Sequence, residues 1–243
     1  MATKATWTRL LVDQWDFSSV SNSLETSVNV QREDVTTFQS TAKQFVAIGA
    51  EGGIAQAGYL TTFAANSFEQ EITEAINNTE SLYVAALYGT DTAKCPAYVA
   101  RGANADGMTI KAASDKVLTL SGSWGEGSGI CRGYRMFSGT ISATGGQTYI
   151  DMGAAGSAGG LAWLFIQAIT GTATNATITV QSDDNTGFAT PATEGTFTFS
   201  AVGGQEIALS GAVDRYVRLN ATSLGGATNY TVVGVIALSG ITY

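Results

Sequence analysis

Alternation of apolar and polar positions along the chain predicts strands. Val28 and Val30 alternate with polar neighbours, as in a half-buried strand, and Leu10–Val12 and Ile54–Leu60 are further short apolar runs. Later β-rich runs, each bounded by Gly, Asp or Asn, cover residues 81–88, 97–101, 116–124 and 131–137. The first part of the chain is therefore expected to fold as a β-barrel or sandwich.

One stretch has helical periodicity and predicts a short α-helix at about residues 67–78. Asn66 and Ser67 are suited to cap its N-terminus, and Glu69 and Gln70 are placed for a capping box. An apolar stripe at helical spacing is expected to pack on a sheet, and its members are Phe68, Ile72, Ala75 and Ile76.

The composition of the sequence changes at about residue 138. Beyond this point Lys is absent, and apolar runs recur with turn residues between them, at 148–152, 162–169, 176–182, 195–200, 205–210, 214–220 and 229–238. This spacing is typical of an all-β sandwich, Ig-like or jelly-roll-like. The segment 138–146 is the expected junction, so the sequence predicts two domains, residues 1–137 and 138–243.

The composition is low in charge and leaves two interpretations open. Of 243 residues, 44% are hydrophobic and 13% are charged, whereas about a quarter is usual for charged residues in soluble domains. Either much of the surface is buried against other subunits, or the protein has a neutral, Thr- and Gly-rich surface. No run approaches the ~18 apolar residues of a membrane span. Met1–Arg9 lacks the apolar core of a secretory signal, so we expect a soluble protein without a membrane partner.

The residue types available restrict the chemistry of the chain. The absence of His excludes Ser-His-Asp and Cys-His nucleophile systems and any His-ligated metal. Cys95 and Cys131 lack metal-ligand spacing and are expected to be mostly buried thiols, with a disulfide as the alternative. We therefore expect no enzymatic activity, no cofactor and no metal.

One acidic segment offers a possible cation site. Asp183, Asn185 and Gly187 echo the start of a calcium loop, and Glu194 stands where the loop requires its final ligand. Pro191 and the lack of helical flanks oppose this interpretation. A polar β-turn between two strands is the favoured prediction.

Several motifs together resemble a known family. A VD…DFSS motif at 12–19 is followed by a strand pattern, then by DVTTF and AKQF within 34–45, a Gly-rich strand and one short helix. With these motifs, residues 10–60 resemble the major tail (tail tube) proteins of long-tailed bacteriophages. The later motifs ITVQSDDNTGF and VDRYVRLN are similar to the C-terminal part of some members. RYVRL is also similar to the terminal strand of discoidin-type glycan-binding domains, which leaves the role of the second domain open.

The resemblance implies a tail-tube-type β-barrel or sandwich for the first domain. It also implies a virion structural protein, located in the tail and synthesised in the host cytoplasm. Family members form rings, typically hexameric, that stack into a hollow tube, and each subunit's sheet joins its neighbours to line the lumen. The implied partners are other copies of the chain and further tail proteins, namely tape measure, terminator and baseplate. DNA would pass through the lumen during ejection without specific binding.

The charge of the chain is consistent with such a conduit. The net charge is −8 and the twelve basic residues are scattered singly, whereas tight non-specific binding of nucleic acid requires clustered Lys and Arg that release counterions. We expect a net acidic lumen, with the basic residues mainly at subunit contacts. This expectation would be contradicted by a lumen dominated by the basic side chains of Arg32, Lys43, Lys111 and Lys116.

The resemblance also implies that a long loop between two early strands, about residues 31–50, reaches the adjacent ring as an assembly arm. Apolar side chains would anchor this contact and polar ones would adapt by hydrogen bonding. The candidate inter-ring residues are Asp34, Thr37, Phe38, Lys43, Phe45 and Val46. The alternative is an ordinary surface loop followed by a barrel strand.

Two other functions remain as alternatives. One is a head decoration or baseplate component built on similar β modules. The other is a carbohydrate-binding β-sandwich protein that uses Trp163, Tyr216 or Tyr230 as stacking platforms, which requires those rings to be exposed rather than part of a core.

Overall fold

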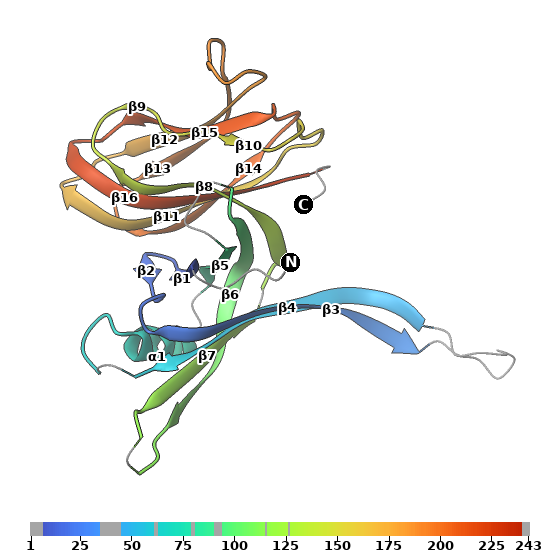
Figure 1. Ribbon diagram of the computed structural model, residues 1–243, viewed down its shortest axis with the longest axis vertical. Coiled ribbons are helices and arrows are strands. Elements are labelled where there is room, and N and C mark those ends of the chain that lie inside the picture. Colours follow the sequence, from blue (N-terminus) through green and yellow to red (C-terminus); the bar gives the residue numbers. More distant parts are fainter. Residues whose placement is uncertain are drawn as a thin grey trace, which may run out of the picture. The chain divides into compact units, whose positions relative to one another are not determined.

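The computed structural model describes residues 7–34, 45–60, 63–78, 81–89, 94–114, 116–125 and 127–239. This part of the chain contains antiparallel strands and a single α-helix (Figure 1). The mostly β fold predicted from the sequence is therefore confirmed. Residue contacts divide the chain into two compact units: unit 1 consists of Met1–Ser19, Ala85–Val99 and Cys131–Tyr243, and unit 2 of Val20–Val84 and Ala100–Ile130.

Unit 1 contains the predicted all-β sandwich. Its first sheet has the order β14-β11-β16-β8, formed by Gly203–Leu209, Gly160–Gly171, Ala227–Leu238 and Ile130–Ile141. This sheet continues through β6, β5, β1 and β2, which are Pro96–Lys111, Leu82–Gly89, Trp7–Val12 and Trp15–Asp16. The second sheet has the order β10-β15-β12-β13, formed by Ile150–Asp151, Tyr216–Ser223, Ala176–Asp183 and Ala192–Phe199, and β9 (Gly145–Gly146) pairs with β15.

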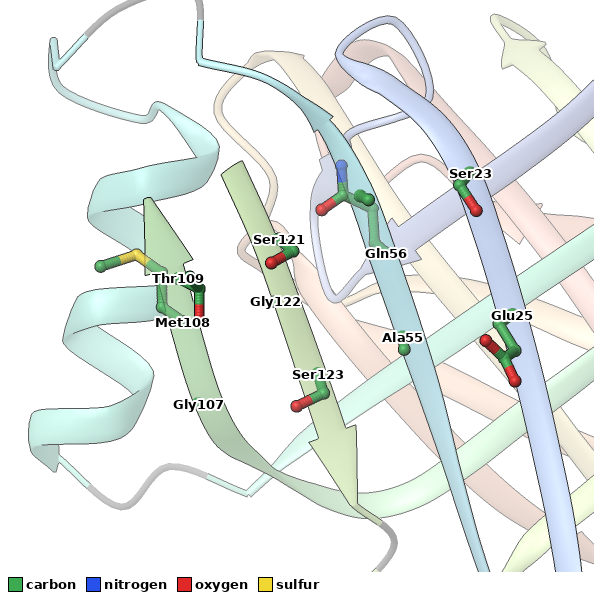
Figure 2. Close-up of a pocket in the computed structure, with 11 residues that line it drawn as sticks. Ser23, Glu25, Ala55, Gln56, Gly107, Met108, Thr109, Ser121, Gly122 and Ser123 are labelled. Carbon is green, nitrogen blue, oxygen red and sulfur yellow. The ribbon is translucent and has the colours of Figure 1, made fainter. Parts of the chain in front are cut away.

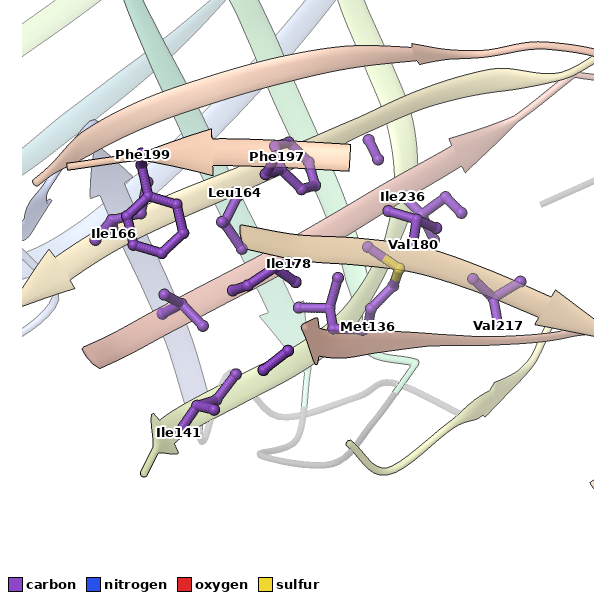
Figure 3. Packing of buried hydrophobic residues seen from close by; sticks show 14 of the residues in the cluster. Met136, Ile141, Leu164, Ile166, Ile178, Val180, Phe197, Phe199, Val217 and Ile236 are labelled. Carbon is purple, nitrogen blue, oxygen red and sulfur yellow. The ribbon is translucent and has the colours of Figure 1, made fainter. Parts of the chain in front are cut away.

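A continuous apolar core joins the two sheets of the sandwich (Figure 3). Leu164 on β11 belongs to the same buried cluster as Ile178 and Val180 on β12 and Phe197 on β13. These side chains occupy alternate strand positions, because successive residues of a strand point to opposite faces. Full burial of each side chain contributes about 1.5–3 kcal/mol, so the core explains why the short strands of this region form a stable sandwich.

Unit 2 contains a sheet in which β3 (Ser21–Asp34) pairs with β4 (Phe45–Tyr59), β4 with β7 (Thr119–Gly125), and β7 with the later residues of β6. β4 pairs with β7 only from Gly53 onward. The remaining parts of β3 and β4 pair with each other from Val28 to Asp34, and thus continue past the sheet as a two-stranded ribbon (Figure 1).

The helix α1 (Phe68–Asn78) forms where its capping signals predict. The Gln70 N–H donates to Ser67 Oγ at 3.3 Å, and the Asn66 N–H donates to Gln70 Oε1 at 2.9 Å. These bonds satisfy backbone donors that a helix N-terminus leaves unpaired. The predicted cap at Ser67 is thereby confirmed, Asn66 contributes its backbone N–H rather than a side-chain cap, and the helix begins one residue later than predicted.

α1 packs its apolar stripe against β7, and a glycine makes this possible. The Phe68 and Trp124 rings meet edge to face with centroids 5.7 Å apart. A Cβ on Gly122 would lie 2.2 Å from Ile72 Cδ1 and 3.1 Å from Phe68 Cζ. Ile76, expected on the same face, is 39% exposed instead, because it lies about 80° around the helix from Phe68 at 3.6 residues per turn.

The close approach of α1 to β7 predicts a large effect of a side chain at position 122. Gly122→Val should lower the free energy of unfolding by about 1–3 kcal/mol, as is typical of overpacking in a core. Urea denaturation followed by circular dichroism measures this change. The matched control is Ser121→Val on the neighbouring position, which should change stability by no more than about 0.5 kcal/mol. Equal effects of both variants would show that α1 does not pack on Gly122.

The boundary expected between residues 137 and 138 falls inside β8, where Ser138 pairs with Val233 of β16. The two compact units consist of interleaved segments rather than of two consecutive halves. The division into domains 1–137 and 138–243 stays a prediction, and a cut at residue 138 would divide β8.

Candidate functional site

The sheet of unit 2 carries α1 on one face and a row of small side chains on the other. Leu120, Gly122 and Trp124 face α1, so Ser121 and Ser123 face the opposite side. The register brings residues of neighbouring strands into line with them, in the rows Ser23–Ala57–Ser121–Thr109 and Glu25–Ala55–Ser123–Gly107. We call these eight residues, with Ser27 and Gly53 in the next row, the small-residue face.

The small-residue face is hollowed because its side chains are short. A hollow of about 390 Å³ lies over it, and its lining includes Glu25, Ala55 and Ser123. Figure 2 shows Glu25 on β3, Ala55 on β4, and Ser121 and Ser123 on β7, which are three neighbouring strands of this sheet. A second hollow, of about 250 Å³, is lined by residues that include Ser27, Asn29, Glu51, Gly53 and Asp106. Together they form an open polar surface along the sheet.

The described charges on and beside this face are mainly acidic. Glu25 is part of the face. Glu51 on β4 pairs with Asn29 on β3, and this pair forms the row after Ser27 and Gly53. Asp106 lies next to the same surface, since a Cβ on Gly125 would be 2.7 Å from its Oδ2. Lys111, in register with Thr119, lies at the opposite end of the β6–β7 pair from Asp106. Among the described residues no group of His, Cys, Asp or Glu is arranged to hold a metal.

Three of the six candidate arm residues, Asp34, Phe45 and Val46, are among the residues that the structure describes. Asp34, which is exposed, is in register with Phe45, and Glu33 is in register with Val46, so these positions form the end of the described ribbon. Thr37, Phe38 and Lys43 lie outside the described residues. The role of all six candidates in contacts between rings stays a prediction.

Sequence reasoning did not identify the small-residue face. The signal was present as alternate small residues in two predicted strands, Ala55 and Ala57 in one and Ser121 and Ser123 in the other. This signal identifies a face only when the register of the strands is known, because a shift by one residue would turn these side chains toward the helix.

The aromatic residues considered as stacking platforms are mostly part of the core. Trp163 and Tyr230 are fully buried, and burial raises the pKa of the Tyr230 hydroxyl. They cannot stack on a ligand at the surface. Tyr216 is half-buried. Cys95 is buried, Cys131 is half-buried, and neither is part of a disulfide, as the sequence predicts.

The expected turn after β12 is present. Asp183 Oδ1 accepts a hydrogen bond from the Asn185 N–H at 3.0 Å, and Oδ2 accepts one from the Thr190 N–H at 3.3 Å. The Asn185 bond, followed by weaker causes, lowers the pKa of Asp183. Glu194 accepts instead from the Ser182 hydroxyl on the adjacent strand. The two acidic residues therefore hold a turn and a strand pair rather than converging on a calcium ion.

A salt bridge on the sandwich predicts a specific pH dependence. Arg215 Nε donates to Asp151 Oδ1 and Arg215 Nη2 donates to Oδ2, each at 2.7 Å, and this pairing lowers the pKa of Asp151 from 3.8 to about 2. Because the folded pKa is depressed, the stabilisation is present above pH 4 and is lost as the pH falls toward 2. Asp151→Asn should lower the melting temperature at pH 7 but not at pH 2. A difference that persists unchanged at pH 2 would contradict this assignment.

No protein-family model and no curated protein sequence matches the chain. Solved structures that are similar to it include a chain of the virion of a native gene transfer agent particle, at 11% identity and a TM-score of 0.39, covering 50% of this chain and 92% of that chain. A chain of the sheath–tube complex of an extracellular contractile injection system has 9% identity and a TM-score of 0.42, covering 54% of this chain and 90% of that chain. The SPP1 Dit protein, described as a hub adsorption apparatus of phages that infect Gram-positive hosts, has 9% identity and a TM-score of 0.32, covering 96% of this chain and 99% of that chain.

In the part of the chain that the structure describes, no helix combines the length and the apolar composition that crossing a membrane requires.

Proposed function

We propose that the protein is a structural subunit of a phage tail, which forms rings that stack into the tube through which DNA is ejected. The observation that carries this proposal is the two-sided character of the unit 2 sheet. One face is covered by α1, while the other presents short polar side chains and acidic groups. Hexameric rings are the arrangement that the family resemblance implies.

The small-residue face has the properties that the wall of a DNA channel requires. Side chains no longer than that of Thr dominate it, so few groups project into the path of a passing duplex. The carboxylates of Glu25, Glu51 and Asp106 repel phosphate, whereas clustered Lys and Arg would release counterions and retain DNA. Such a wall allows DNA to slide without specific binding.

The ribbon formed by β3 and β4 supports a role in contacts between subunits. Beyond Gly53 its strands have only each other as described pairing partners. An isolated two-stranded hairpin is marginally stable in water, so contact with a neighbouring copy would stabilise it. We propose that residues 31–50 form the arm that reaches the next ring, with Phe38, Phe45 and Val46 as apolar anchors. The tape measure, terminator and baseplate proteins of the tail are the proposed further partners, and the virion tail is the proposed location.

Sedimentation velocity and negative-stain microscopy of the purified full-length protein test this proposal. We expect rings at low concentration and tubes of uniform diameter at high concentration, because stacking depends on mass action. Rings that never stack would favour the alternative of a baseplate or head decoration component. A protein that stays monomeric at every concentration would contradict an assembly role.

A further inference from the structure

An aromatic–arginine cluster lies at one end of the second sheet of the sandwich, and consists of Tyr149, Phe188, Arg215, Tyr216 and Arg218. The Tyr149 ring is 5.6 Å from Tyr216 and 6.0 Å from Phe188, measured between centroids. Arg215 Cζ lies 5.2 Å from the centroid of the Tyr216 ring, and Arg218 Cζ lies 4.0 Å from that of Phe188. The contacts join segments from three parts of the sandwich into one surface.

The polar members of the cluster are fixed in place. Asp151 accepts both hydrogen bonds from Arg215 and a third from the Gly153 N–H at 2.7 Å. Arg218 Nε donates to Gln181 Oε1 at 3.0 Å. The backbone at Gly146 also approaches the Arg218 guanidinium, since a Cβ there would lie 2.5 Å from Cζ. Side chains held in this way lose little further freedom when a ligand binds.

The backbone within the cluster is strained. Phe188 has a φ of 47°, in the left-handed region that residues other than glycine rarely adopt, and its side chain is 7% exposed. Such strain is found preferentially where a surface is shaped for binding. Here the conformation places the Phe188 ring against Tyr149 and Arg218.

The exposed parts of the cluster combine an apolar ring with a planar ion pair. Tyr149 is 39% exposed, and the side chains of Arg215 and Asp151 are 47% and 40% exposed. The guanidinium donates hydrogen bonds and the carboxylate accepts them, while their charges offset each other. Farther along the same strands, Asn220 donates to Thr179 and the hydroxyls of Thr177 and Thr222 are hydrogen-bonded, which extends the polar surface.

We propose that the aromatic–arginine cluster binds a neutral saccharide. A sugar ring has an apolar face of C–H groups, which matches the exposed ring of Tyr149, and a rim of hydroxyls that both donate and accept, which matches Arg215 and Asp151. The exposed Arg215–Asp151 pair carries no net charge, while Arg218 is held against Phe188 and Gln181, so the exposed polar contact favours a neutral sugar over an anionic one. This function goes beyond the tail role and does not depend on it, because binding requires the sandwich but no assembled tube.

Binding of the purified full-length protein to an array of neutral hexose and N-acetylhexosamine oligosaccharides tests the proposal. The oligosaccharide that binds best is then titrated by calorimetry against variants. Tyr149→Ala and Arg215→Ala should each weaken binding about tenfold or more, as expected for central anchors of an interface. Tyr149→Phe keeps the ring and should retain the affinity. The matched control, Val202→Ala, removes an exposed apolar side chain of the same sandwich and should have no effect.

A second measurement on the unmodified protein does not depend on how the variants fold. In saturation-transfer difference NMR with the same oligosaccharide, the C–H protons of one sugar face should receive the strongest saturation. The proposal is overturned if no neutral oligosaccharide binds, if Tyr149→Ala binds as well as the wild type, or if saturation is uniform around the sugar.

Discussion

Replacement of residues 35–44 by Asn-Gly should yield a folded protein that forms rings but no tubes. Asp34 and Phe45 are register partners at the end of the ribbon, so a two-residue type I′ turn can join them directly. Shortening a loop changes its closure entropy only slightly, and the fold should be retained. The contacts between rings, in contrast, would be lost with the arm. Circular dichroism measures the first expectation and electron microscopy the second.

A matched pair of substitutions tests which arm residues carry the contact. Phe38→Ala should raise the concentration needed for tube formation about tenfold, since truncation of an aromatic anchor at an interface commonly costs more than about 1 kcal/mol. Thr37→Ala, at the adjacent position, should have little effect. Tubes of normal length after replacement of residues 35–44 would show that the arm assignment is wrong.

In the proposed tube, a basic residue on the small-residue face should cause DNA to be retained, whereas the wild-type tube should not bind it. Ser123 is half-buried in the hollow over this face, and Ser123→Arg would place one guanidinium per subunit around each ring. DNA should then bind to the assembled tubes at low salt. If a ring contributes about six phosphate contacts, affinity should fall roughly a thousandfold between 50 and 200 mM salt.

The charge rather than the size of the new side chain should cause this effect. Ser123→Gln introduces a longer side chain without charge and serves as the control, with DNA binding expected to stay at the level of the wild type. Fluorescence anisotropy with labelled duplex DNA measures both variants. Equal behaviour of the Arg and Gln variants would contradict the assignment of this face to the channel.

Much of the fold could be predicted because local patterns determine it. Apolar runs such as 162–169 and 229–238 form β11 and β16, and consecutive buried residues in both strands, 162–166 and 232–236, show that both faces are covered. The capping box of Ser67 and Gln70 marked the start of α1, because the hydrogen bonds involved connect residues within a single turn.

Features that depend on distant pairing could not be predicted in the same way. β8 runs continuously through residue 138, where it is held by pairing with β16. That partner strand begins almost ninety residues later in the chain. The change in composition near residue 138 gave no information on this pairing. The small-residue face likewise depends on the register of β3, β4, β7 and β6.

Whether an aromatic ring is buried or exposed also depends on residues far away in the chain. Tyr230 belongs to the buried cluster between the two sheets, whereas Trp163 lies on the opposite face of β11 from Leu164, and both rings are fully buried. The apolar runs that contain them do not show on which face each ring is covered. Tyr149 precedes the very short strand β10. Nothing in the local sequence pattern marks its ring as part of a binding surface. Its ring becomes a candidate binding surface only beside Tyr216 and Phe188, which come from later parts of the chain.

A cryo-electron microscopy reconstruction of the assembled protein tests the central claim most directly. The account predicts a hollow tube of stacked rings in which the small-residue face of the unit 2 sheet lines the channel, with Glu25 and Ser123 directed toward the axis and α1 on the side away from it. A tube whose channel is lined by α1 or by the sandwich of unit 1 would contradict the account.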